Sequence, residues 1–242
     1  MCGLAGYISF NKKMNNNLEK YQVNSILKKI EHRGPDSEGI YEDDKVILGH
    51  RRLKIRDLSN NSNQPFMSQN KSIVIIFNGE IYNYEEILNE IKKTNKNFKP
   101  KTSCDTELIA EIASIKGINC LKYLEGMFSI VIHTKNQGTF LARDRFGIKP
   151  LFYTTNSASG IYFSSELKSL KHLVDCNQIN LQSFSEYLYF GSRISNRNSF
   201  YSEIDLIPPG HFLCIKENKQ FIKEWWSIDD WIGNYQNNDD LE

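Results

Sequence analysis

The stretch from Gly126 to Arg143 reads GMFSIVIHTKNQGTFLAR, and it decides the fold class. Two runs rich in β-branched and aromatic residues, Met127–His133 and Gly138–Arg143, are separated by a short polar segment, which predicts two consecutive strands. Similar short runs follow at Pro150–Thr154 and Gly160–Ser164, again after turn residues. Consecutive, antiparallel strands of this kind favour an α+β fold over a doubly wound parallel sheet.

Helical and strand patterns surround this stretch. Apolar residues recur at helical spacing in Leu18–Ile30, Thr106–Lys116 and Leu181–Phe190, so we predict a helix in each range. Gly117 is placed to cap the second of these helices. Additional strands are predicted at Tyr7–Phe10, Lys45–Ile55 and Ser72–Phe77, and a hairpin at His211–Ile215 with Gln220–Glu224.

Composition excludes several classes of protein. The chain has 242 residues, which suits one large domain or one domain with an appendage. Its 40% hydrophobic and 24% charged residues are typical of globular proteins, and a net charge of +1 gives no electrostatic reason to expect a nucleic-acid or membrane partner. The longest apolar run, Ile73–Phe77, is far too short to cross a bilayer. Neither a secretory signal nor a membrane anchor is expected.

The cysteines and histidines argue against disulfides and metals. The five cysteines include no Cys-x-x-Cys pair, so we expect free thiols in a reducing cytoplasm rather than a disulfide framework or a zinc site. No two histidines stand at ligand spacing, so no metal site is expected. The chain also has neither a Gly-x-Gly-x-x-Gly nor a Gly-x-x-x-x-Gly-Lys-Ser/Thr motif, and no nucleotide site of these types is predicted.

Cys2 is the first candidate for chemistry. Removal of Met1 would place a thiol and a free α-amine on one residue. Because the α-amine has an ordinary pKa of about 7.7–8.0, it is partly neutral at pH 7 and can take the proton of the thiol. The alternative is an incidental cysteine.

Two further groups complete the list of candidates. Asn78-Gly79 ends an apolar strand and offers a side-chain amide beside a glycine N–H, which suits an oxyanion hole, although the dipeptide is more typical of a turn. Arg52 and Asp105 offer a guanidinium and a carboxylate that suit the two charged ends of an amino acid. The alternatives for this pair are a surface cation and an acid at a helix N-terminus.

Nine short motifs occur in an order that resembles the class II glutamine amidotransferase domain of the glutamine-hydrolysing asparagine synthetases. The resemblance covers about residues 2–215. The motifs are Cys2-Gly3-Leu4-Ala5-Gly6, His32-Arg33-Gly34-Pro35-Asp36, Gly49-His50-Arg51-Arg52-Leu53, Gln64-Pro65-Phe66, Phe77-Asn78-Gly79-Glu80-Ile81-Tyr82-Asn83, Asp105-Thr106-Glu107, Glu125-Gly126-Met127-Phe128, Ala142–Leu151 and Ser164-Ser165-Glu166-Leu167-Lys168.

The resemblance implies a fold and a mechanism. The implied fold is a four-layer αββα sandwich of the N-terminal nucleophile hydrolase type. Cys2 would attack the carboxamide of glutamine, a thioester would form, ammonia would leave, and water would release glutamate. Matched position by position, the catalytic residues are Cys2, Asn78 and Gly79, with Asn78 and Gly79 forming the oxyanion hole. The matched substrate-binding residues are Arg52 for the carboxylate, Asp105 for the ammonium, and Leu53, Ile55, Arg56 and Glu80 as further lining.

The resemblance also implies what accompanies the domain. Residues 2–205 are predicted to be the glutaminase domain, and 206–242 a junction toward an ATP-dependent synthetase domain that this sequence lacks, ending in Leu241-Glu242, which resembles a cloning scar. No cofactor is expected here, because ATP and Mg²⁺ would bind the absent domain. The expected partners are L-glutamine and that domain, and a homodimer is left open. The chain alone should make glutamate and ammonia but no asparagine.

Two other functions stay open. A related class II amidotransferase domain could supply ammonia to a different acceptor, such as a sugar or a ribosyl donor. The chain could also be a non-catalytic interaction module that retains the fold, although Cys2, Asn78, Gly79 and Asp105 are all present.

Overall fold

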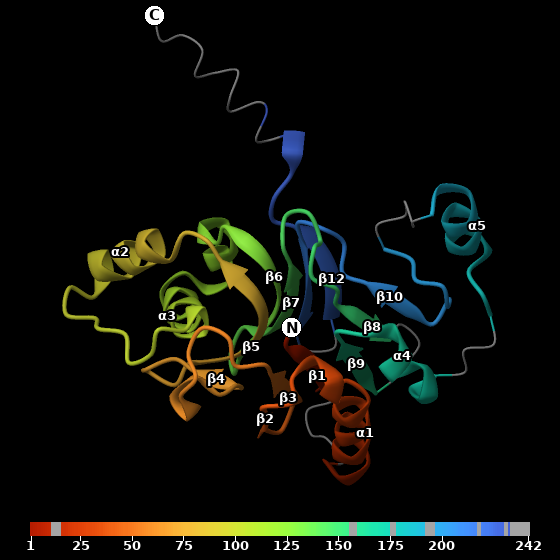
Figure 1. Cartoon of the computed structure of the whole chain (residues 1–242), viewed down its shortest axis with the longest axis horizontal. Coiled ribbons are helices and arrows are strands. Elements are labelled where there is room, and N and C mark those ends of the chain that lie inside the picture. The colour runs from red at the N-terminus through yellow and green to blue at the C-terminus, as the bar shows by residue number, and fades with distance from the viewer. Residues whose placement is uncertain are drawn as a thin grey trace, which may run out of the picture.

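The structure is a computed structural model that describes residues 1–10, 16–154, 159–174, 178–191, 197–216, 219–229 and 232 (Figure 1). Cys176 and the predicted scar at Leu241-Glu242 lie outside these residues. No helix in the described part of the chain is long and apolar enough to cross a membrane.

Two sheets, each of six strands in the described residues, form the centre of the fold, and their paired strands run antiparallel. In spatial order the first contains β10 (Ile204–Leu206), β8 (Phe152–Thr154), β9 (Gly160–Ser164), β1 (Gly3–Ser9), β3 (Val46–Arg52) and β2 (Ser37–Glu42). The second contains β12 (Lys219–Glu224), β11 (His211–Lys216), β7 (Gly138–Arg143), β6 (Gly126–Thr134), β5 (Ile73–Ile81) and β4 (Phe66–Met67).

Helices cover the outer faces of the two sheets (Figure 1). The helices are α1 (Asn16–Lys29), α2 (Tyr84–Thr94), α3 (Asp105–Lys116), α4 (Leu167–Leu170) and α5 (Leu181–Phe190), with 3₁₀ turns η1 (Glu31–Arg33), η2 (Asn60–Ser62), η3 (Gly117–Tyr123) and η4 (Lys171–Leu173). The helices α1 and α4 pack on the first sheet, and α2 and α3 pack on the second. The predicted αββα sandwich is therefore confirmed.

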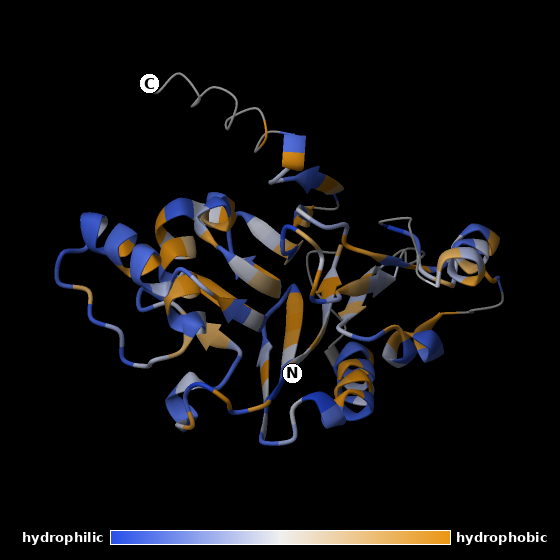
Figure 2. Ribbon diagram, turned by 45° about the horizontal axis from the view of Figure 1, so that its top comes forward, coloured by the Kyte–Doolittle hydropathy of each residue, from blue (hydrophilic) through white to orange (hydrophobic). Residues whose placement is uncertain are grey.

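The alternation of side chains along β5 shows how one strand serves two layers. Ile73, Ile75 and Phe77 point toward the helices α2 and α3, whereas Val74 and Ile76 point into the core between the sheets. Because successive side chains of a strand face opposite sides, a strand buried on both faces reads as a continuous apolar run. A helix needs only one apolar face, and Figure 2 shows α1 divided into a hydrophobic and a hydrophilic side.

Most predicted elements are confirmed. The three predicted helices correspond to α1, α3 and α5, and the predicted hairpin is β11 with β12. Gly117 caps α3 with a φ of 60°, and its N–H donates to the carbonyl of Ala113. This hairpin lies after the predicted boundary at residue 205, yet it extends the second sheet beside β7. The sandwich itself therefore reaches Glu224.

The turn that is typical of Asn-Gly does not form at Asn78-Gly79. The strand β5 continues through both residues to Ile81, and they pair with Ser129 and Phe128 of β6. Glycine is needed at residue 79 for a different reason than a turn, since a Cβ there would collide with the Met127 carbonyl and the Phe128 backbone. The strand β2 and the helix α2 were not predicted, and β1 begins at Gly3 rather than Tyr7.

A buried polar cluster ties the two sheets together at one end. The carboxylate of Asp43, between β2 and β3, lies 2.8 Å from Nε2 of His133 in β6, whose Nδ1 lies 2.8 Å from the Thr139 hydroxyl in β7. Burial opposes ionisation of Asp43, but hydrogen bonds from His133 and from the N–H of Lys45 outweigh it and hold the pKa of the carboxyl well below its ordinary value.

We predict that Asp43→Asn lowers the free energy of unfolding by about 1–3 kcal/mol at pH 7. Because the folded-state pKa of Asp43 is depressed, its stabilisation is complete above the ordinary carboxyl pKa of about 3.9 and is lost as the pH falls through the folded value. Urea titrations from pH 7 to pH 3 should therefore show the gap between wild type and variant closing toward acid. The exposed neighbour Asp44, changed to Asn, is the matched control and should show no such gap.

Candidate active site

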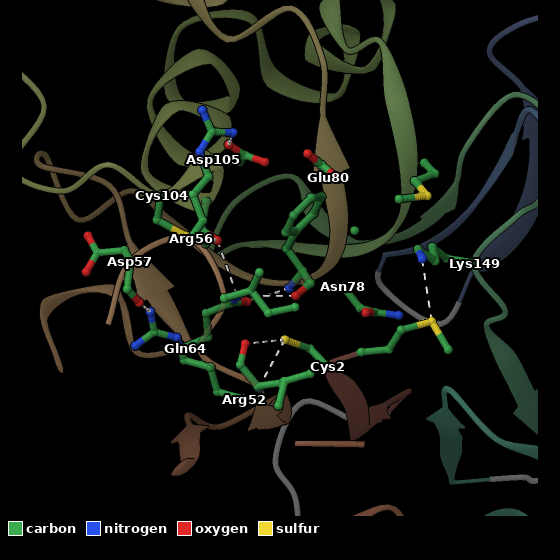
Figure 3. Close-up of a pocket in the computed structure, with 17 residues that line it drawn as sticks. Cys2, Arg52, Arg56, Asp57, Gln64, Asn78, Glu80, Cys104, Asp105 and Lys149 are labelled. Carbon is green, nitrogen blue, oxygen red and sulfur yellow. Dashed lines mark hydrogen bonds and ion pairs between the residues drawn. The ribbon is translucent and has the colours of Figure 1, made fainter. Parts of the chain in front are cut away.

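One pocket, of about 230 Å³, gathers every residue predicted for the site (Figure 3). Its lining includes Cys2, Arg52, Leu53, Ile55, Arg56, Asn78, Gly79, Glu80 and Asp105. These residues come from the position just before β1, the end of β3 and the loop after it, the second half of β5, and the first residue of α3. Segments far apart in the sequence therefore meet at one edge of the sandwich.

The thiol of Cys2 rests against the backbone of Leu53. The Leu53 N–H donates to Sγ at 3.5 Å, and Sγ lies 3.9 Å from the Leu53 carbonyl oxygen. Burial raises the pKa of the Cys2 thiol, although the Leu53 hydrogen bond, the chain's N-terminal ammonium and Arg52 act in the opposite direction. The guanidinium of Arg33 fixes the neighbouring backbone, because its Nε donates to the Cys2 carbonyl at 3.0 Å.

Two hydrogen-bond donors on β5 face this pocket without a partner in the described residues. The carboxamide of Asn78 is buried, and its Nδ2 has no acceptor. Gly79 lies opposite Phe128, whose own N–H and carbonyl bond Asp144. Because donors alternate between the two sides of a strand, the Gly79 N–H points away from β6, toward the open edge of β5.

Asp105 closes the other end of the pocket. Its carboxylate accepts the N–H of Ile81 at 2.9 Å and lies 2.6 Å from the guanidinium of Arg56 (Figure 3). Burial raises the pKa of Asp105, and these two donors oppose that rise. The side chain of Arg56 is half exposed, so this ion pair stands at the mouth of the pocket.

Arg52 is almost fully buried and holds the adjacent loop. Its guanidinium donates to the carbonyl of Ser59 at 2.7 Å, to Oδ1 of Asn63 at 2.8 Å, and to the carbonyl of Asp57. These contacts use three of its five N–H donors. Arg52 thus holds the loop after β3 and also lines the pocket.

Several pocket residues had no role assigned from the sequence. Gln64, Cys104 and Lys149 also line the pocket, and Arg33 touches Cys2 from outside the lining. The buried ammonium of Lys149 lies 3.5 Å from the thioether of Met1. Gln64, Lys149 and Arg33 each belong to one of the nine motifs, whereas Cys104 does not. The motifs gave no role to these residues, because their contacts depend on the directions of side chains, which the sequence does not show.

No metal site accompanies this arrangement in the residues that the structure describes, since no three His, Cys, Asp or Glu side chains converge there. The pocket instead offers a thiol, two unpaired donors and a pair of opposite charges. That set suits attack on a carbonyl group of a small zwitterion.

A cysteine at the second residue, leading directly into the central strand of a four-layer αββα sandwich, defines the N-terminal nucleophile class of amidotransferase fold. The family model of the glutamine amidotransferase domain matches residues 1–226. The chain belongs to this family.

Relatives with curated names agree with this assignment. The chain is 39% identical to asparagine synthetase [glutamine-hydrolyzing] 2 of Bacillus subtilis, over 95% of this chain and 31% of the relative. It is 33% identical to a putative asparagine synthetase [glutamine-hydrolyzing] 2 of Methanocaldococcus jannaschii, over 96% of this chain and 47% of the relative. The chain thus spans 31% and 47% of the length of these two relatives.

Solved structures share the fold at low sequence identity. A glutamine phosphoribosylpyrophosphate amidotransferase from B. subtilis superposes with a TM-score of 0.65 at 18% identity, over 93% of this chain and 49% of that one. An allosteric regulatory enzyme of purine biosynthesis superposes with a TM-score of 0.67, also at 18% identity, over 93% of this chain and 49% of its own.

The burial of Cys2 predicts its reactivity in protein that retains Met1. Because the thiolate is the reactive form and burial disfavours it, alkylation by iodoacetamide should rise with a midpoint above the ordinary thiol pKa of about 8.5. Mass spectrometry of the Cys2 peptide across pH 6–11 measures this midpoint, with Cys104→Ser as the control for the second pocket thiol. A midpoint at or below that of a free cysteine peptide would contradict the prediction.

Proposed function

We propose that this chain is a glutaminase that hydrolyses L-glutamine to glutamate and ammonia through a thioester on Cys2. The observation that carries the proposal is the unpartnered, buried Nδ2 of Asn78 in the same pocket as the Cys2 thiol. A buried donor without an acceptor is costly in a folded protein, so such a group is expected where a ligand supplies the acceptor.

The proposed reaction begins once Met1 has been removed. The α-amine of Cys2 then takes the thiol proton, and the thiolate attacks the carboxamide carbon of glutamine. The carbonyl oxygen becomes an oxyanion that accepts hydrogen bonds from the Asn78 carboxamide and the Gly79 N–H. The protonated amine returns its proton to the departing nitrogen, so ammonia leaves as the carbon–nitrogen bond breaks. Water, deprotonated by the same amine, then cleaves the thioester and releases glutamate.

The charged residues would select the amino-acid end of the substrate. We assign the α-carboxylate to the two remaining donors of Arg52 and the α-ammonium to Asp105. Leu53, Ile55, Arg56 and Glu80 would line the rest of the site. Arg56 already neutralises Asp105 in the unliganded pocket, so binding of the substrate ammonium would have to share or displace that ion pair.

The destination of the ammonia is a separate proposal. The curated relatives are named glutamine-hydrolysing asparagine synthetases and are at least twice as long as the matched region. We infer that the ammonia serves ATP-dependent amidation of aspartate on a further domain, where ATP and Mg²⁺ would bind. A different acceptor is the alternative, and the residues of this chain do not distinguish the two.

The first experiment measures glutamate release from L-glutamine by protein shown by intact mass to lack Met1. We expect release by the wild type and none by Cys2→Ala, with asparagine absent when ATP, Mg²⁺ and aspartate are added. Protein that retains Met1 is the matched control, since its Cys2 nitrogen is an amide and cannot act as the base. Wild-type protein without Met1 that releases no glutamate would instead support the interaction module.

A second prediction isolates the oxyanion hole. Asn78→Ala should lower kcat by about 100–1,000-fold while leaving KM nearly unchanged, because the lost donor serves the oxyanion more than the ground-state carbonyl. Steady-state kinetics on Met1-free protein measure both constants. Asn119→Ala, at an exposed asparagine outside the pocket, is the control. A variant whose KM rises while kcat stays constant would place Asn78 in substrate binding instead.

A further inference from the structure

The motif Gln64-Pro65-Phe66 has no part in the mechanism proposed above, yet its first residue is built into the pocket. Gln64 is only 6% exposed and lines the same cavity as Cys2 and Asn78. A buried carboxamide needs partners for both its oxygen and its nitrogen. The partners of Gln64 lie on β5 and α3, the two elements that supply Asn78, Gly79 and Asp105.

The side chain of Gln64 replaces a missing stretch of backbone pairing. The edge strand β4 pairs Phe66 with Ile75, and the same register would place residue 64 opposite Phe77. At this position the side-chain carboxamide of Gln64, rather than its backbone N–H and carbonyl, pairs with the backbone of Phe77. Its Oε1 accepts the Phe77 N–H at 2.6 Å, and its Nε2 donates to the Phe77 carbonyl at 3.2 Å. A primary amide can do this because it carries the same donor and acceptor as a peptide group.

The Phe77 carbonyl belongs to the peptide that begins Asn78, so its plane sets the direction in which the Asn78 side chain leaves the strand. Nε2 of His50 donates to the same carbonyl at 3.1 Å. Complete burial lowers the pKa of His50 to about 4, so this histidine is neutral and its single N–H is committed to that bond. Two buried side chains therefore fix this peptide plane.

The stretch of β5 from Phe77 to Ile81, which contains Asn78 and Gly79, is held at both ends from the same side. Gln64 holds Phe77, and Asp105 holds the N–H of Ile81, so the Gly79 N–H lies midway between two filled positions. Nε2 of Gln64 also lies 3.2 Å from the Thr106 hydroxyl, in the first turn of α3. Gln64 thus links the strand that carries the oxyanion donors to the helix that carries Asp105.

We propose that Gln64 is a positioning residue, whose carboxamide holds the Phe77–Gly79 backbone in the geometry that stabilises the oxyanion. This inference rests on the proposed glutaminase function. Gln64 touches no reacting atom in this assignment, and it acts through Asn78 and Gly79. A small displacement of the two donors weakens their bonds to the short-lived oxyanion more than it weakens binding of the whole substrate.

The test compares Gln64→Leu with Ser68→Ala. Ser68 is a matched control at the other end of the same edge strand, because its buried hydroxyl accepts the N–H of Ile73 on β5 at 3.1 Å. Ser68→Ala removes one side-chain hydrogen bond from the ladder and should lower Tm by about 2–4 °C, whereas Gln64→Leu removes two from the ladder and a third to Thr106 and should lower Tm further. Only Gln64→Leu should lower kcat for glutamine hydrolysis, by about 100-fold.

Binding of a γ-aldehyde analogue of glutamine provides a readout that needs no turnover. The Cys2 sulfur adds to the aldehyde carbon, the carbon–oxygen double bond becomes single, and the thiol proton neutralises the oxygen, which occupies the position of the oxyanion. Gln64→Leu should weaken this adduct about 100-fold while leaving L-glutamate binding within a few-fold of wild type. Calorimetric titration on Met1-free protein measures both affinities.

A third variant, Gln64→Glu, keeps the shape of the side chain and removes its donor while ionised. Its activity relative to wild type should rise as the pH falls and the carboxyl gains a proton to donate to the Phe77 carbonyl. Equal effects of Gln64→Leu on aldehyde and glutamate binding, or effects equal to those of Ser68→Ala, would overturn the proposal. Wild-type protein that binds the aldehyde but releases no glutamate would contradict the glutaminase function alone.

Discussion

The open edge of β5 is the constraint on which the site depends. The edge strand β4 covers only the first part of β5, and from Phe77 to Ile81 the outward N–H groups have no neighbouring strand. Unpaired backbone donors must find partners in a folded protein. Side chains satisfy the first and the last of them, Gln64 at Phe77 and Asp105 at Ile81. The donor left between them belongs to Gly79, so the geometry that completes the sheet also leaves free the backbone donor that the proposed reaction uses.

The position of Cys2, the proposed nucleophile, depends on the packing of the other sheet. Cys2 directly precedes β1, whose side chains are buried on both faces, so its position is set by the core rather than by the chain end. Leu53, just beyond β3, contacts the thiol, and Arg33 holds the carbonyl. Cys2 is therefore held by contacts with two other segments of the fold as well as by the strand that follows it. The two sheets must stack correctly before Cys2 can face Asn78.

Two errors in the sequence-based prediction share one physical origin. Asn-Gly is a strong local signal for a turn, but here the close approach of β6 requires a residue without a Cβ, and the strand continues. Local propensity contains no information about a neighbouring strand that lies about fifty residues away in the chain. The role of Gln64 was missed for a related reason. Its motif was visible, but nothing in three residues indicates that a side chain will substitute for a backbone ladder.

The sequence alone determined the class of fold and predicted the members of the site. Periodicity predicted the strand-rich second half and three of the helices, and the ordered motifs predicted that Cys2, Asn78, Arg52 and Asp105 share one site. Only the tertiary structure decided which donors are free. Whether the Asn78 carboxamide, the Gly79 N–H or the Arg52 guanidinium has a partner depends on distant segments packed against it. Hydrogen bonds between such segments form only when the sheets and helices have closed around them, so they leave no local pattern in the chain.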